Sequence, residues 1–114
     1  MLNDRLIVAQ NVASELLPAE AEVDSAIVHA SRLTIAVVEG RRKARLPITV
    51  GQEALSHVAS ATTQLVNARA QLGSAHVALR AAKDEIGLRA VGMGDLWDCP
   101  SFAENVTEIS AKVA

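Results

Sequence analysis

The sequence predicts an all-α protein: a long antiparallel helical hairpin followed by a short C-terminal helix. Alanine recurs at every seventh residue of one stretch, and a larger apolar residue follows each alanine four positions later. A second stretch of similar length has the same seven-residue spacing. Half of the 114 residues are hydrophobic but only 2% are aromatic, so the core must consist of aliphatic side chains at helical spacing.

The first helix is expected over about residues 3 to 43. Pro18 falls inside it, and a proline in a helix either ends or kinks it. Apolar residues recur in sevens on both sides of the proline, at Leu2, Ala9, Leu16, Val23, Ala30 and Val37. A loop would usually reset this phase, so we expect one long helix, kinked near Pro18. The alternative is two helices, with Pro18 at the first position of the second.

The turn of the hairpin is expected around residues 46–49. Pro47 disfavours helical conformation at Leu46. Thr49 followed by Gln52 has the form of a capping box, so the second helix should begin near Val50. Its length would then match that of the first helix, which favours an antiparallel hairpin.

The second helix carries the alanine repeat and defines the predicted seam. It should continue at least to Ile86, where Gly87 is a natural C-terminal stop. A seven-residue apolar repeat indicates a helix that buries one stripe against another helix. Alanine at one of the two core positions lets the partner backbone come close. The predicted seam residues are Ala54, Val58, Ala61, Leu65, Ala68, Leu72, Ala75, Leu79, Ala82 and Ile86.

Apolar residues also extend beyond this seam on both arms. They are Leu55, Ala59, Val66 and Ala70 on the second arm and Ile7, Val8, Ile35 and Val38 on the first. A stripe of this width usually has another helix packed on it. We therefore expect the hairpin to complete a four-helix bundle by oligomerising, or to be covered by its own C-terminal helix.

The C-terminal part differs from the arms in composition. The capping-box sequence of residues 101–104 predicts a short helix that ends near Lys112. Trp97 and Phe102 are the only aromatic residues, and with Leu96 they are the predicted partner-binding residues, because interfaces use aromatic anchors. The alternative is that this arm folds back over one end of the hairpin. The expected domains are a helical hairpin or bundle, residues 1–92, and a C-terminal arm, residues 93–114.

The sequence contains no pattern typical of a catalytic, cofactor-binding or metal-binding site, so we expect neither an enzyme nor a cofactor. His29, His57 and His76 form no pair at i, i+4 and no H-E-x-x-H motif. They are expected to be surface histidines that flank the seam. Cys99 is the only cysteine, which excludes an internal disulfide, and no base is placed beside it for nucleophilic chemistry.

The charges are nearly balanced. A formal net charge of -2, from 11 basic and 13 acidic residues, gives no general attraction to nucleic acid or acidic membranes. One basic cluster complements the negative end of the first helix and is the candidate set of phosphate contacts: Arg41, Arg42, Lys43 and Arg45. No charged region followed by an apolar run opens the sequence, so we do not expect a signal peptide, and no apolar run reaches about 20 residues. We therefore expect a cytoplasmic protein or part of a larger particle, without a membrane partner.

The function expected from these features is non-enzymatic. The chain should be a homo-oligomeric structural, assembly or adaptor protein that acts through helix packing and recruits a protein partner with its aromatic arm. The alternatives are a nucleic-acid-associated regulator that uses the basic tip, and a bacteriophage particle component. The architecture is similar to that of secreted helical hairpins, secretion chaperones and bacteriophage components. The W-x-G turn of the secreted hairpins is absent, because residues 45–48 read Arg-Leu-Pro-Ile.

Overall fold

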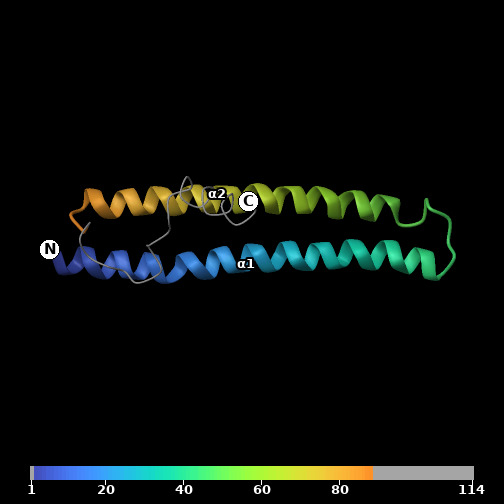
Figure 1. The fold of residues 1–114 in the computed structure, drawn as a ribbon, viewed down its shortest axis with the longest axis horizontal. Coiled ribbons are helices and arrows are strands. Elements are labelled where there is room, and N and C mark those ends of the chain that lie inside the picture. Colours follow the sequence, from blue (N-terminus) through green and yellow to red (C-terminus); the bar gives the residue numbers. More distant parts are fainter. Residues whose placement is uncertain (1, 89–114) are drawn as a thin grey trace, which may run out of the picture.

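The two helices of the chain lie side by side as an antiparallel hairpin (Figure 1). The structure is a computed structural model that describes residues 2–88. Helix α1 spans Leu2–Lys43 and helix α2 spans Gln52–Glu85, with 42 and 34 residues. At ~1.5 Å per residue they extend about 63 Å and 51 Å. The predicted all-α hairpin is confirmed, whereas the predicted helix at residues 101–112 and the domain boundary after residue 92 lie outside the described residues.

Helix α1 runs through Pro18 as one helix, not two. The buried face keeps its seven-residue spacing across the proline, because Ala9 and Leu16 are buried before it and Val23 is half-buried after it. Pro18 itself is exposed. The expectation of one long helix is therefore confirmed over the alternative of two helices, and the kink at Pro18 stays a prediction.

The C-terminus of α1 is closed by backbone hydrogen bonds in a Schellman arrangement. The Leu46 amide donates to the Arg41 carbonyl at 3.1 Å, and the Arg45 amide donates to the Arg42 carbonyl at 3.1 Å. This arrangement places Arg45 in the left-handed region, with a φ of 55°. Glycine is the usual residue at this position, because a Cβ makes the left-handed conformation costly.

Helix α2 begins at Gln52, two residues after Val50, and the predicted capping box at Thr49 is wrong. Gly51 precedes the helix with a φ of 82°, and no side-chain hydrogen bond caps it. A Cβ on Gly51 would also lie 3.4 Å from Cγ1 of Val37. The chain therefore enters α2 through a conformation that glycine adopts without strain, which replaces the expected side-chain cap.

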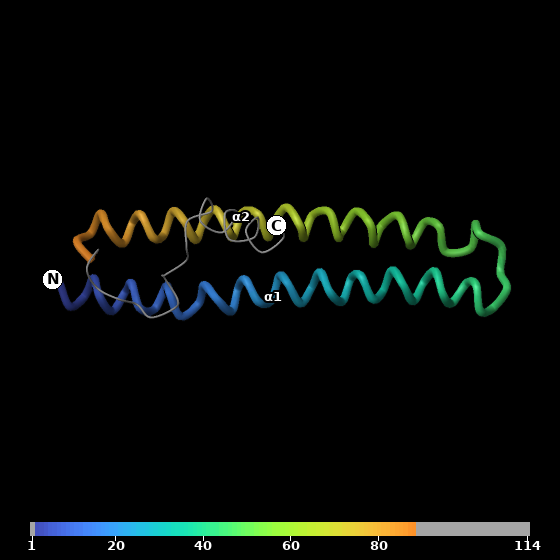
Figure 2. Tube along the Cα trace, viewed as in Figure 1, coloured from blue at the N-terminus to red at the C-terminus, as the bar shows by residue number. Residues whose placement is uncertain are grey.

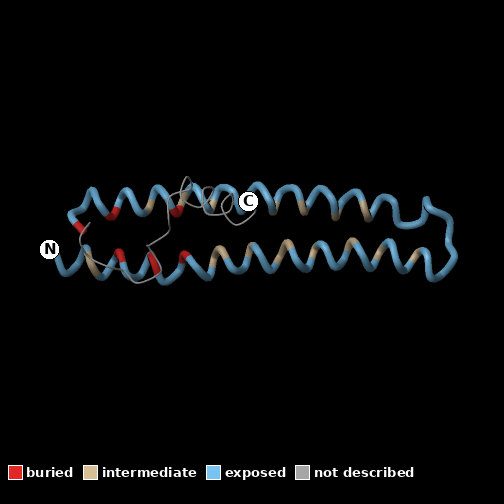
Figure 3. Tube along the Cα trace, in the orientation of Figure 1, coloured by how far each residue is buried: buried red, intermediate tan, exposed pale blue. Residues whose placement is uncertain are grey.

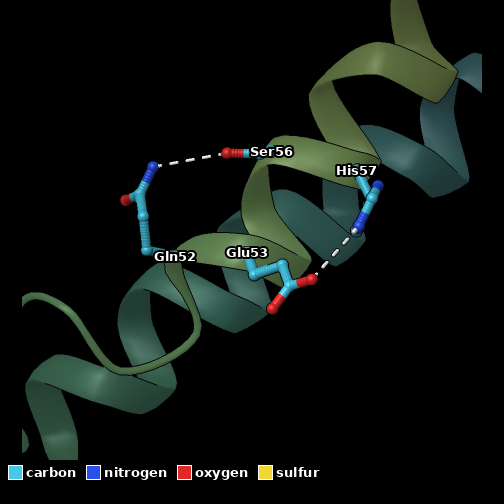
Figure 4. A network of polar contacts seen from close by, with 4 residues as sticks. All are labelled: Gln52, Glu53, Ser56 and His57. Atoms are coloured by element: carbon cyan, nitrogen blue, oxygen red, sulfur yellow. Dashed lines mark hydrogen bonds and ion pairs between the residues drawn. The ribbon is translucent and has the colours of Figure 1, made fainter.

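Exposed polar pairs support the first turn of α2 (Figure 4). The Gln52 amide lies 3.4 Å from the Ser56 hydroxyl, and Nε2 of His57 lies 3.8 Å from a carboxylate oxygen of Glu53. Both members of the Glu53–His57 pair are exposed, so water screens the pair and it adds little to helix stability.

Helix α2 ends at Glu85 with Ile86 as its C-cap, one residue earlier than predicted, and the predicted stop at Gly87 is confirmed. This glycine has a φ of 87°. Its amide donates to the Asp84 carbonyl at 3.1 Å, and the Leu88 amide donates to the Lys83 carbonyl at 3.1 Å. These two bonds form a second Schellman motif, in which the residue after the glycine turns back onto the hairpin.

The buried residues gather towards the end of the hairpin that holds the N-terminus (Figure 3), where the described chain also ends (Figure 2). Leu88 is only 1% exposed and forms a cluster with Ala9 and Ala13, against which Leu6 and Leu79 pack. Nη1 of Arg5 donates to the Ile86 carbonyl at 3.3 Å and ties the two helix ends together.

The two helices contact each other through residues that repeat in sevens. On α1 the inward columns are Leu6, Ala13, Glu20, Ile27, Thr34 and Arg41, and Ala9, Leu16, Val23, Ala30 and Val37. On α2 one inward column consists of Val58, Leu65, Leu72 and Leu79, all half-buried. A strict seven-residue repeat on both helices is the geometry of an antiparallel coiled coil.

Candidate functional site

A polar column on α2 faces α1 beside the Val58–Leu79 column. Its members are Leu55, Thr62, Arg69, His76 and Lys83, spaced seven residues apart. His76 is 6% exposed and Lys83 is 8% exposed, and Thr62 is half-buried. The interface between the helices is therefore apolar along one column of α2 and mostly polar along the other.

Buried His76 pairs with Glu20 of α1. The His76 Nδ1 lies 2.8 Å from Oε1 of Glu20, and the two side chains are 8% and 30% exposed. An ionised carboxylate only accepts hydrogen bonds, so Nδ1 is the donor in this pair. The prediction that His76 is a surface residue is wrong, because it occupies an inward position of the heptad.

A second polar pair, between Asp24 and Arg69, lies closer to the hairpin tip, with Asp24 one helical turn beyond Glu20 on α1. Nε of Arg69 donates to Oδ1 of Asp24 at 2.6 Å. The two side chains are 62% and 58% exposed, so water screens the pair. The hydrogen bond and the negative charge of Asp24 raise the pKa of Arg69 above its ordinary value, so the guanidinium is charged in this pair.

These two pairs line a shallow polar cleft on one side of the hairpin. The cleft has a volume of about 290 Å³ and is lined by Glu20, Asp24, Arg69, Leu72, Gly73 and His76. Its charged groups bind one another, and none of the lining residues carries a hydroxyl or thiol nucleophile. The arrangement can fix the alignment of the two helices, because each charge is satisfied only when its partner lies opposite.

The other side of the hairpin has an apolar groove near the terminal end. One part, of about 150 Å³, is lined by Val8, Ala9, Val12, Leu79, Ala82, Lys83 and Ile86. The adjoining part, of about 410 Å³, is lined by Asn11, Val12, Glu15, Leu16 and Leu79. Val8 is 60% exposed, so a large apolar side chain at the rim of this groove is open to solvent.

The ten predicted seam residues divide by burial. Six are half-buried: Val58, Leu65, Ala68, Leu72, Ala75 and Leu79. Four are exposed: Ala54, Ala61, Ala82 and Ile86. The alanine column thus lies at the edge of the contact with α1, next to the apolar groove, because Ala82 is one of the groove residues.

The predicted phosphate contacts lie at the tip of the hairpin. Arg41 is half-buried, and its Nη1 donates to the Leu46 carbonyl at 3.1 Å, so it stabilises the turn. Arg42, Lys43 and Arg45 are exposed. The tip therefore offers three exposed basic side chains within four residues.

Sequence reasoning missed the role of Glu20, Asp24, Arg69 and His76. The signal was present, since the polar column is spaced in sevens exactly as the alanine column is. Both columns flank the Val58–Leu79 column. The alanine column was predicted to face α1 because alanine is apolar and the other column is mostly polar. Of the other histidines, His29 and His57 are exposed. Residues 2–88 contain no group of three His, Cys, Asp or Glu side chains that could hold a metal ion.

The predicted partner-binding residues Leu96, Trp97 and Phe102 lie outside the described residues. Neither α1 nor α2 contains an apolar stretch of the length that a membrane crossing requires. Comparison of the chain with protein-family models, with curated proteins and with solved structures gives no match.

Proposed function

We propose that this protein is a non-enzymatic assembly protein whose hairpins associate with one another to complete a helical bundle. One observation carries the proposal. Fifteen large hydrophobic residues between Leu2 and Ile86 are exposed, whereas the buried hydrophobic residues of the described chain are only Ala9, Ala13, Leu16 and Leu88. A hairpin with so small a core gains most of its stability from further packing.

The distribution of the exposed residues supports association of whole helix faces. Ile7, Val28, Leu33, Ile35 and Val77 are about half exposed or more, at 54%, 47%, 51%, 54% and 71%. They are spread along both helices and are not confined to one end. Such a surface suits a partner that is itself an extended helical element, and a second hairpin is the simplest one.

The test is the mass of the full chain in solution, measured by light scattering across a hundredfold range of concentration, with helix content followed by circular dichroism. We expect a dimer or larger assembly at micromolar concentration and a loss of helix content on dilution. A folded monomer at every concentration would refute the proposal. A bacteriophage or other larger particle is a setting in which a bundle of this kind would serve as a building block.

A nucleic-acid-associated regulator is the second candidate, favoured by the exposed side chains of Arg42, Lys43 and Arg45 at the tip. Binding to a fluorescent DNA duplex would then fall steeply as salt rises, because released counterions drive such binding. Simultaneous Arg42→Ala and Lys43→Ala substitutions should reduce the affinity and the salt dependence together. Equal affinity of parent and variant would exclude the tip as the contact.

A further inference from the structure

We infer that the occupant of the apolar groove is a second copy of this chain, packed antiparallel so that its tip half lies over the terminal half of the first. This inference rests on the proposed function and adds the face and the orientation of the association. Three observations carry it: a mostly apolar groove face, a polar interruption of the opposite face, and a division of charge between the two halves of the hairpin.

The groove face is apolar along most of the hairpin. On α1 it consists of Val12, Ala19, Ala26 and Leu33, and on α2 it consists of the alanine column from Ala54 to Ala82. The groove itself contains Val12 and Ala82, which places both columns on the same side of the hairpin. Since most of these side chains are small, a second hairpin can approach the backbone closely.

The opposite face, here called the cleft face, is broken by charge. Its corresponding positions are Leu17, Asp24, Ser31 and Val38 on α1 and Ala59, Val66, Gly73 and Arg80 on α2. Asp24 and Arg69 form their ion pair on this side, and the polar cleft opens there. A helix packed over this face would have to desolvate the pair, which is costly. The groove face is therefore the better interface.

Formal charge divides the hairpin into two unlike halves. Residues 25–75, the tip half, carry six basic and two acidic side chains, an excess of four positive charges. Residues 2–24 and 76–88, the terminal half, carry three basic and seven acidic side chains, an excess of four negative charges. In an antiparallel pair each positive half lies over a negative half, whereas a parallel pair places like charges together.

The groove face is large enough for a stable dimer. From Ala54 to Ala82 it is about 42 Å long, at ~1.5 Å per residue, and two helices make it about 20 Å wide. The face therefore offers roughly 800 Å², which is the area that each partner contributes to a standard stable interface. Val8 and Leu33, which are 60% and 51% exposed, would supply large apolar contacts along it.

The face is tested with two matched substitutions in the full chain. Ala61→Glu places a charge on the groove face, and Val66→Glu places the same charge on the cleft face, at positions that are both exposed in the hairpin. We expect Ala61→Glu to raise the dimer dissociation constant by about tenfold or more, because a charge would be buried. Val66→Glu should leave it within about threefold of the parent. Circular dichroism at a concentration where each variant is assembled checks that both still fold.

The orientation is tested by pulsed electron paramagnetic resonance on a spin label at the tip. Glu53→Cys combined with Cys99→Ser gives one labelling site, at a residue whose side chain is 92% exposed. An antiparallel pair places the two labels about 50 Å apart, at ~1.5 Å per residue from the middle of α2, and a parallel pair places them within about 20 Å. The dissociation constant of the antiparallel pair should also rise with salt, since unlike charges attract across the interface.

The outcomes separate this inference from the proposed function. A parent protein that stays monomeric refutes both. A dimer that Val66→Glu dissociates, or that Ala61→Glu leaves intact, refutes the groove face but leaves the assembly proposal standing. Tip labels within about 20 Å refute the antiparallel orientation alone. An antiparallel dimer that is lost with Ala61→Glu and kept with Val66→Glu supports the inference.

Discussion

The His76–Glu20 pair is expected to cost stability when one member is replaced and little when both are. We predict this for Glu20→Leu, His76→Leu and the double variant. The single Glu20→Leu substitution removes the carboxylate that accepts from a ring nitrogen 2.8 Å away, on a histidine that is 6% exposed. The double variant places two leucines opposite each other, as in an ordinary apolar layer of a coiled coil.

The magnitudes follow from burial. A hydrogen bond to a charged group contributes about 1.5–3 kcal/mol, and the lower part of this range applies because the Glu20 side chain is 30% exposed. We therefore expect Glu20→Leu to lower the free energy of unfolding by about 1–2 kcal/mol. In the double variant, two partly buried leucines recover about 1 kcal/mol each, which brings the free energy of unfolding to within about 1 kcal/mol of the parent.

Urea unfolding followed by circular dichroism measures these differences, with all four proteins at one concentration because association also adds stability. The double-mutant cycle gives the coupling energy between positions 20 and 76, which should be about 1–3 kcal/mol. Asp24→Ala is the control for an exposed pair and should change the stability by less than about 1 kcal/mol. A coupling energy below about 0.5 kcal/mol would show that the pair does not hold the helices in alignment.

Three further substitutions test the turn and the core by urea unfolding. Arg45→Gly places glycine at a left-handed position where a Cβ is unfavourable, and should stabilise the hairpin by about 0.5–1 kcal/mol. No gain in stability would mean that the Schellman closure of α1 is not formed. Gly51→Ala forces a Cβ into the left-handed region and should cost about 1–2 kcal/mol, whereas a neutral effect would contradict that backbone conformation. Leu16→Ala at a 5% exposed position should cost about 2–5 kcal/mol, and a cost below 1 kcal/mol would mean that the terminal end is not packed.

The hairpin itself was predictable from the sequence. The seven-residue phase that continues past Pro18 predicts a single first helix, and the structure confirms it. The stop at Gly87 was predictable for the same kind of reason, since a glycine that follows a helical repeat favours the left-handed closing residue. Both signals lie within a single helix and its end, so they can be recognised without knowing how the partner helix packs.

The details that depend on tertiary packing were not predictable. Thr49 and Gln52 have the spacing of a capping box, yet Gly51 provides the start of α2 through its backbone conformation. His76 looks like a surface residue until its register against Glu20 is known. Two columns on α2 were equally spaced, and only the rotation of the helix about its axis decides which of them faces α1. Spacing in a sequence does not fix that rotation when both columns flank the same apolar residues.

The tightest packing of the hairpin joins the parts of the chain that are furthest apart along the backbone. Arg5 and Ile86, which are linked at the terminal end, are 81 positions apart, and the Asp24–Arg69 pair spans 45. If the two helices associate from the turn outward, the contacts of the Leu88 cluster form last. Their formation requires the largest loss of loop-closure entropy, which grows slowly with loop length. The Leu88 cluster closes the open end of the hairpin, so we expect its contacts to be lost together when that end frays. Amide exchange at Ala9 and Ala13 slower than at mid-helix residues would show that this cluster governs opening.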